Sequence, residues 1–469
     1  MVATNEMIAP VMMMGVMCLL LLFGAFLRVK IPFLRKMMFS ASIIAGVLGF
    51  ILMSTHVLPL STNAFESLSL HLLSLNLMSI CYLNIGRKKE RGKKGDPSKR
   101  GGLTMGLATG SVICLQALLG GILAIVVRAC GFADFKDCYG YIIANGFGAS
   151  PSAALAAGKL WQTGGLGEDV IQIGLFYGAV GFLVASLVGV PLLKHMIKKH
   201  MVTNADTAMD KAAINGFFSA EDDNVPGYGK QTLHRSNLDT LVFYLAFLFG
   251  TYSIIYCGMS WLFNKLPSGG DMLYSCMFIF AVLGALVFMA LVKLFKLDRF
   301  FNYEIQVSVS NVTTDLLLVA CMMAVSITVV ARYLLPLLIN CVLITVVTIV
   351  VCWFYARKTG KYWAERFLFL YGNATGTMVS GQVLLRAVDP SFKTIGNEIV
   401  AFQSFGLLTS FTTNMAMFVP MMTTAIYLGI NAGVAVLAGV LCLLLAKNLR
   451  KAQKKVDEQR EAVTENTAA

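Results

Sequence analysis

Charged residues are scarce in this sequence. Only 13% of the 469 residues are Asp, Glu, Lys or Arg, whereas 57% are hydrophobic. A soluble globular protein carries about 25% charged residues, so this composition excludes an ordinary soluble globule. Apolar runs of about 20 residues recur along the chain, and a helix of that length crosses the ~30 Å hydrocarbon layer of a membrane. The sequence therefore predicts a multi-pass membrane protein whose partner is the lipid bilayer.

Motifs that would indicate other classes are missing. The 11 cysteines form no CxxC pair and no disulfide-like spacing, so we interpret them as small apolar residues. The chain contains no HExxH, GxSG or GxGD motif, which argues against an intramembrane enzyme. Its net charge of +13 comes from short basic clusters between apolar runs. Such clusters set membrane orientation and do not indicate a nucleic-acid partner. We also expect no cofactor.

Apolar segments fill both halves of the chain. In the first half we expect membrane segments at Ile8–Arg28, Met37–Thr55, Phe65–Gly86, Gly101–Ala129, Tyr139–Gly158 and Asp169–Met196. In the second half we expect them at Leu238–Phe263, Met272–Phe295, Ile305–Thr328, Tyr333–Ala356, Phe367–Arg386, Glu398–Thr424 and Ile426–Ala446. All of them read as helices, so the predicted fold class is all-α.

These segments divide the chain into two membrane regions, residues 8–199 and residues 238–425. Residues 200–237 join them and are polar, charged and interrupted by Gly and Pro, so we predict a cytoplasmic linker. An additional transmembrane helix follows at residues 426–446. Residues 447–469 are highly charged and are expected to form a cytoplasmic tail.

Two of the segments, Tyr139–Gly158 and Phe367–Arg386, are rich in Gly, Ser, Thr and Asn. Non-helical backbone at membrane depth survives only where protein or a water-filled cavity satisfies it, so these segments could be re-entrant hairpins instead of spans. If the first segment crossed the membrane, Lys194, Lys198 and Lys199 would lie outside. If both segments enter and return, the basic clusters lie inside, as the positive-inside rule prefers.

The hairpins have an architectural consequence. Each half then contains five transmembrane helices plus one re-entrant hairpin, and an odd number of crossings inverts the second half relative to the first. The sequence therefore predicts two inverted repeats and an extra C-terminal helix. Secondary transporters are often built in this way, with broken helices near the midplane that form the substrate and ion sites. We accordingly expect an alternating-access transporter of a small polar solute.

The sequence resembles the bacterial sodium:glutamate symporter family. The resemblance rests on the segment NGFGASPSAALAAGKLW at residues 145–161 and on the following helix, GEDVIQIGLFYGAVGFLVASLVGVPLLKH. The run SNVTTDLLLVACMM and the second hairpin lie at corresponding places, whereas the family's hairpin histidine is Phe147 here. The resemblance implies a homodimer in a bacterial inner membrane. It also implies sodium-coupled uptake of glutamate or a related anionic or zwitterionic solute, by a mobile hairpin-bearing core that moves against a fixed scaffold.

The first hairpin offers the leading candidate substrate site. Gly146 permits non-helical backbone, Pro151 suits the first turn of a new helix, and Ser150 would cap that helix. A helix N-terminus attracts a carboxylate through its free N–H groups and its dipole. The predicted substrate-binding residues here are Asn145, Gly146, Gly148, Ser150 and Ser152. The alternative is a packing face of small residues.

The second hairpin and one acidic residue supply the expected ion site. Asn373, Thr375 and Thr377 are candidate substrate ligands, as is Asn414 on the span that follows, near an acidic position of the family. Asp315 lies in an apolar run, where a carboxylate is costly and indicates function by default. The predicted ion-coupling residues are Asp315, Asn311, Thr314 and Ser380. Their oxygens suit sodium, a hard cation. Alternatively, Asp315 is a structural carboxylate that neighbouring threonines hydrogen-bond.

Other functions remain open at the level of the sequence. A proton-coupled or exchange carrier of another small organic anion would use the same architecture. An ion channel would also use oxygen-rich filters, but two opposed hairpins suit alternating access better. We interpret His71, a lone histidine on an apolar segment, as a packing residue.

Overall fold

The computed structural model describes residues 2–58, 60–85, 97–203, 232, 238–265, 273–274, 276–389, 394–403 and 415–468, and within these ranges all regular structure is helical. The helices of the first half are α1 (Val2–Lys30), α2 (Pro32–Lys36), α3 (Ala41–Ser54), α4 (Thr62–Tyr82), α5 (Pro97–Ala129), α6 (Asp137–Tyr141), α7 (Ile143–Gly146), α8 (Pro151–Thr163), α9 (Val170–Leu187) and α10 (Gly189–Lys198). Those of the second half are α12 (Thr240–Phe263), α14 (Met277–Leu294), η2 (Leu297–Phe300), α15 (Tyr303–Met323), α16 (Ile327–Arg332), α17 (Leu334–Arg357), α18 (Trp363–Thr375), α19 (Met378–Arg386), α20 (Gly396–Gln403), η3 (Ala416–Met421) and α23 (Thr424–Ala468).

Within the described residues, nine helices are long and apolar enough to cross a membrane. They correspond to nine of the predicted spans, which supports a multi-pass membrane protein. Two predicted spans have no counterpart among these nine helices of the described residues. The first, Met37–Thr55, contains the 14-residue α3, which is shorter than the ~20 residues that a full crossing needs. Much of the second, Glu398–Thr424, lies outside the described residues, as does most of the predicted linker.

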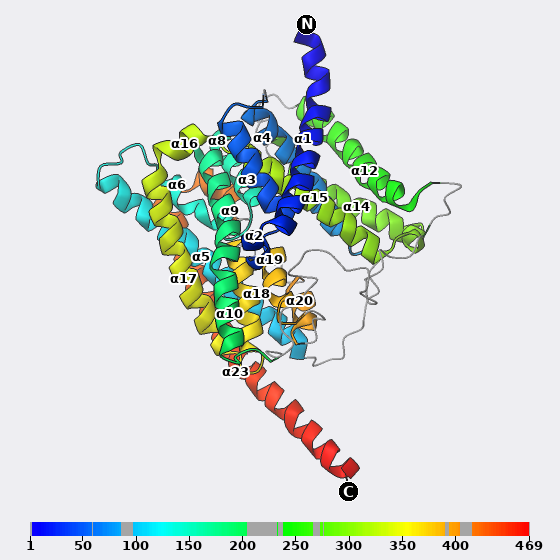
Figure 1. Ribbon diagram of the computed structural model, residues 1–469, viewed down its shortest axis with the longest axis vertical. Helices are drawn as coiled ribbons and strands as arrows, with labels where there is room; N and C mark the ends of the chain where they lie inside the picture. The colour runs from blue at the N-terminus through cyan, green and yellow to red at the C-terminus, as the bar shows by residue number, and fades with distance from the viewer. Residues whose placement is uncertain are drawn as a thin grey trace.

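The helices form two groups that lie side by side (Figure 1). The first group consists of α1, α3, α4, α12, α14 and α15, and the second consists of α5 to α10, α16 to α20 and α23. In Figure 1 the N-terminal end of α1 lies at the top and the C-terminal end of α23 at the bottom. The two chain ends therefore lie at opposite ends of the molecule.

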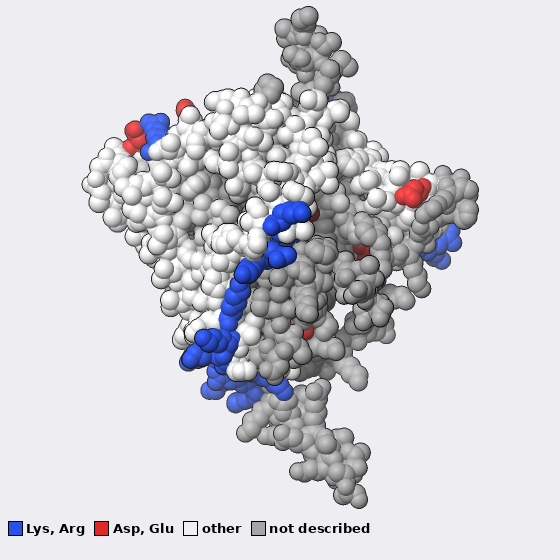
Figure 2. Space-filling view, in the orientation of Figure 1, with Lys and Arg blue, Asp and Glu red and all other residues white. Residues whose placement is uncertain are grey.

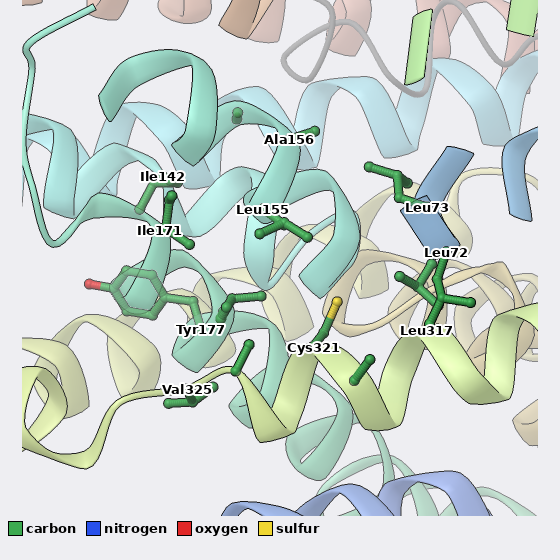
Figure 3. Close-up of a cluster of buried hydrophobic side chains, with 14 of the residues drawn as sticks. Leu72, Leu73, Ile142, Leu155, Ala156, Ile171, Tyr177, Leu317, Cys321 and Val325 are labelled. Atoms are coloured by element: carbon green, nitrogen blue, oxygen red, sulfur yellow. The ribbon is translucent and has the colours of Figure 1, made fainter. Parts of the chain in front are cut away.

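The groups meet through a largely apolar interface (Figure 3). Leu72 of α4 and Leu317 of α15 belong to the same buried cluster as Leu155 of α8 and Ile171 of α9. At its edge, Lys159 of α8 lies 3.4 Å from Glu66 of α4. Apolar contacts have no preferred direction, so this interface can join the groups without a dense network of hydrogen bonds.

Basic residues gather toward one end of the molecule. Figure 2 shows Lys and Arg in a band that runs from the middle of the visible face to its lower end, near the place where α23 projects from the helical bundle in Figure 1. In this region Arg450, in the second half of α23, donates a hydrogen bond to the carbonyl of Arg357 at the end of α17 (2.9 Å). Nearby, α10 packs against α18. Basic clusters that the positive-inside rule assigns to one side of the membrane thus lie close together.

A buried ion pair fastens α18 to α20. Arg366, whose side chain is fully buried, donates from Nε and Nη2 to the two carboxylate oxygens of Glu398 at 2.8 and 2.6 Å. Nη1 donates to the Thr359 hydroxyl at 3.1 Å. A Cβ on Gly101 of α5 would lie 2.3 Å from the Glu398 carboxyl carbon. The pair is therefore enclosed between α5, α18 and α20, at the base of the segment that carries the second helix break.

Candidate functional site

The first half contains a helix break at residues 147–150, between α7 and α8. The Ser150 hydroxyl accepts a hydrogen bond from the Ala153 N–H at 3.0 Å, and Pro151 occupies the first turn of α8. The predicted cap is thereby confirmed. Ser150 also lies 2.8 Å from the Ser152 hydroxyl. Asn145, just before the break, is fully buried, and neither polar atom of its side chain has a hydrogen-bond partner among the described residues.

The second half contains a matching break at Gly376–Thr377, between α18 and α19. The arms on either side pack closely, because a Cβ on Gly372 of α18 would lie 2.7 Å from the Gly381 Cα of α19. The Thr375 hydroxyl donates to the Tyr371 carbonyl at 2.8 Å, so this side chain hydrogen-bonds back to the last turn of its own helix. Phe367–Arg386 is therefore two short helices and not one continuous span.

The two breaks meet on α9, although more than 200 residues of sequence separate them. A Cβ on Gly181 would lie 3.1 Å from the Phe147 carbonyl oxygen of the first break and 2.5 Å from that of Thr375 at the second. Only a glycine leaves room for both carbonyls at this point. The structure thus brings the non-helical backbone of the two halves together inside the helical bundle.

Beside the second break lies a cavity of about 90 Å³. Its polar lining includes Asp315 and Thr314 of α15, Thr377 and Ser380 from the second break and its following arm, and Ser42 of α3. Four of the residues predicted from sequence, on two distant segments, therefore share one cavity. Phe182 of α9, next to Gly181, also lines it, so the cavity adjoins the point where the breaks meet.

Asp315 is the acidic residue of this cavity. The Ser42 hydroxyl hydrogen-bonds to its carboxylate. The threonines before it are engaged elsewhere: the Thr314 hydroxyl donates to the Ser310 carbonyl (2.8 Å) and accepts from the Asn76 amide (2.7 Å). The alternative of a carboxylate bonded by its neighbouring threonines therefore does not describe this geometry, and Asp315 faces the cavity.

The remaining predicted residues are distributed more widely. Asn311 is exposed on α15 and does not line the cavity, and Asn373 lies on α18, two residues before Thr375. Gly146 packs against α9, because a Cβ there would lie 2.4 Å from the Gly174 carbonyl. Asn414 lies outside the described residues. His71 contacts the Tyr252 hydroxyl at 2.6 Å, in keeping with a packing role.

Sequence reasoning missed three residues of this region, Gln116, Gly181 and Ser42. Gln116 is fully buried on α5 and hydrogen-bonds to the second break. A signal for it existed, because a lone amide within the apolar run SVICLQALLGG is a polar residue at membrane depth. Gly181 and Ser42 carry no such signal, since glycine and serine are common packing residues of membrane helices.

The chain matches no protein-family model and no curated protein. The fold and the cavity define its class by themselves: a multi-pass helical membrane protein with two internal helix breaks and an acidic cavity beside them.

Proposed function

We propose that this protein is a secondary active transporter, a sodium-coupled symporter of glutamate or a related amino acid or carboxylate. The observation that carries the proposal is the meeting of two helix breaks at Gly181, beside a cavity that contains the membrane carboxylate Asp315. Broken helices that meet inside the membrane are typical of secondary transporters, because their free backbone ends bind substrate and ions.

In this proposal the two broken segments are re-entrant hairpins of two inverted repeats. The gathering of basic residues near the end of α17 and the second half of α23 supports this topology, which would place this part of the molecule on the cytoplasmic side. The resemblance to the bacterial sodium:glutamate symporters supports the same topology. It also implies a homodimer in a bacterial inner membrane. An apolar stripe on α17, with Val342, Val346 and Val350 each more than half exposed, would face lipid or the second copy.

The roles of the residues follow from their chemistry. The N-terminus of α8, capped by Ser150, would attract the carboxylate of the solute, with the buried Asn145 amide beside it. Asp315, with the hydroxyls of Thr377 and Ser380, would hold the sodium ion, since a hard cation prefers oxygen ligands. The second helix group, which carries both breaks, would move against the first across the apolar interface between them, as in an elevator.

A second candidate uses the same carboxylate. If Asp315 carries a proton during transport instead of binding sodium, the protein is a proton-coupled or exchange carrier of a small organic anion. Asp315 is the acidic residue that lines the cavity, and a membrane carboxylate suits either coupling ion. The ion dependence of transport separates the two candidates.

Uptake by the purified full chain in liposomes tests the function. Thermal stabilisation by a panel of amino acids and carboxylates first identifies the solute, because a ligand that binds the folded state raises its apparent stability. We expect that solute to accumulate only under an inward sodium gradient and to show counterflow. Accumulation that persists in sodium-free buffer under a proton gradient would favour the second candidate. Flux that does not saturate, without counterflow, would indicate a channel.

Cysteine accessibility tests the inverted topology independently of transport. In a background without the exposed Cys18 and Cys257, we expect Glu168→Cys, before α9, to react with a membrane-impermeant maleimide from outside. Asn397→Cys, in α20, should react only from the cytoplasmic side. Both positions are exposed in the structure. Cys130, at the end of α5, serves as the outside reference. Labelling of both positions from one face would refute the opposed hairpins.

A further inference from the structure

Gln116 of α5 connects the second helix break to the body of the protein. Its side chain is fully buried, and its Nε2 donates to the Ala374 carbonyl (2.9 Å), directly before Thr375, and to the Thr348 hydroxyl of α17 (2.9 Å). The Ala374 carbonyl lies at the end of α18, where the last carbonyls of a helix lack an intrahelical donor. Gln116 supplies one of these missing donors.

The other side-chain atom of Gln116 points to the first break. Its Oε1 lies 2.1 Å from the position that a Cβ on Gly148 would take, and the Ala144 carbonyl oxygen lies 2.9 Å from the same position. Oε1 is buried, and no donor among the described residues reaches it. A buried carbonyl oxygen without a partner is costly, so its retention here calls for a partner that arrives with function. The orphaned amide of Asn145, three residues before Gly148, lies on the same segment.

We propose that Gln116 is a specificity-determining residue that bridges the two helix breaks and binds a cation through Oε1 at the first break, outside the cavity of Asp315, whose lining does not include it. The inference rests on the proposed function, because it assigns a further oxygen ligand to the same transport region. Two features favour a cation over the solute's carboxylate: Oε1 is an acceptor, and its neighbour at Gly148 is the Ala144 carbonyl, another acceptor. Through Nε2 the same side chain would transmit occupancy at the first break to the position of the second.

The test measures the thermal stability of the purified full chain as a function of sodium chloride concentration. N-methylglucamine chloride at equal ionic strength is the reference. We expect sodium to stabilise the wild type. Gln116→Leu replaces the amide with an apolar side chain of similar size and so removes both polar atoms. In this variant, half-maximal thermal stabilisation should require about tenfold more sodium than in the wild type, as expected for one lost ligand contact. Gly148→Ala, whose methyl group would displace Oε1, should reproduce this shift even if Gln116→Leu fails to fold.

Gln306→Leu is the matched control. Gln306 is also a buried amide, and its Nε2 donates to the Ser79 carbonyl between α15 and α4 (3.2 Å), away from both breaks. This variant should lose stability but keep the sodium dependence of the wild type. An unchanged sodium requirement in Gln116→Leu and Gly148→Ala overturns the proposal, and so does a wild type that sodium does not stabilise. The proposed transport function fails separately, in the uptake assay, since a protein that binds sodium without moving solute would still give the expected shifts.

Discussion

Asp315→Asn is expected to lower gradient-driven uptake roughly 100-fold while the protein remains folded, because a charged contact to the coupling ion is worth about 1.5–3 kcal/mol. The carboxylate lines the cavity and has the Ser42 hydroxyl as its hydrogen-bond partner. An asparagine keeps the size of the side chain and can still accept that hydrogen bond, so the variant removes the charge and little else. Initial uptake rates in liposomes under the same ion gradient measure the effect.

Asp134→Asn provides the control for loss of an acidic charge. Asp134 pairs with Arg332 at 3.0 Å, and both side chains are more than half exposed, so the pair contributes little. This variant should transport like the wild type. If Asp315→Asn matched it, the carboxylate would have no coupling role, and the proposed site would have to be abandoned.

Arg366→Met is expected to destabilise the protein by about 3–5 kcal/mol, since it leaves the Glu398 carboxylate buried without its partner. The guanidinium is fully buried and holds both carboxylate oxygens. The double variant Arg366→Met, Glu398→Met should recover much of that loss, because well-packed apolar residues often replace a buried ion pair at little cost. Unfolding in detergent micelles, followed by the apparent midpoint in denaturant, measures both changes.

Arg332→Met is the control, because it removes an arginine from an ion pair that is exposed instead of buried. Its exposed pair with Asp134 should contribute little to stability, because solvent screens it. If Arg366→Met were as mild as Arg332→Met, the Arg366–Glu398 pair would not fasten α18 to α20, and the second break would require another anchor.

Local signals in the sequence predicted the membrane class and the two broken segments well. The Ser-Pro pair at positions 150 and 151 marks a helix start, and the structure places the cap there. Such signals depend on the nearest few residues, which a sequence displays directly. The start of the helix within Met37–Thr55 was harder to predict, because hydrophobicity alone does not mark it. The helix begins only after Ser40, whose hydroxyl accepts a hydrogen bond from the Ile43 N–H.

The partners across the molecule could not be predicted from the sequence. Nothing in the chain near Asp315 indicates that Ser42 lies beside it, because more than 250 residues separate the two in sequence. Likewise, the amide of Gln116 could be identified as a polar residue in an apolar run, but not as a bridge to Ala374. These contacts depend on how the helix groups pack, and packing is set by the whole set of buried side chains.

The close approach at Gly181 has an electrostatic consequence. Two peptide carbonyls, one from Phe147 and one from Thr375, turn their oxygens toward the same small volume. Their dipoles add there, and the low dielectric of the protein interior does not screen them as water would. Neutral backbone alone therefore contributes negative potential at this point, and that contribution does not depend on whether the carboxyl groups nearby are protonated.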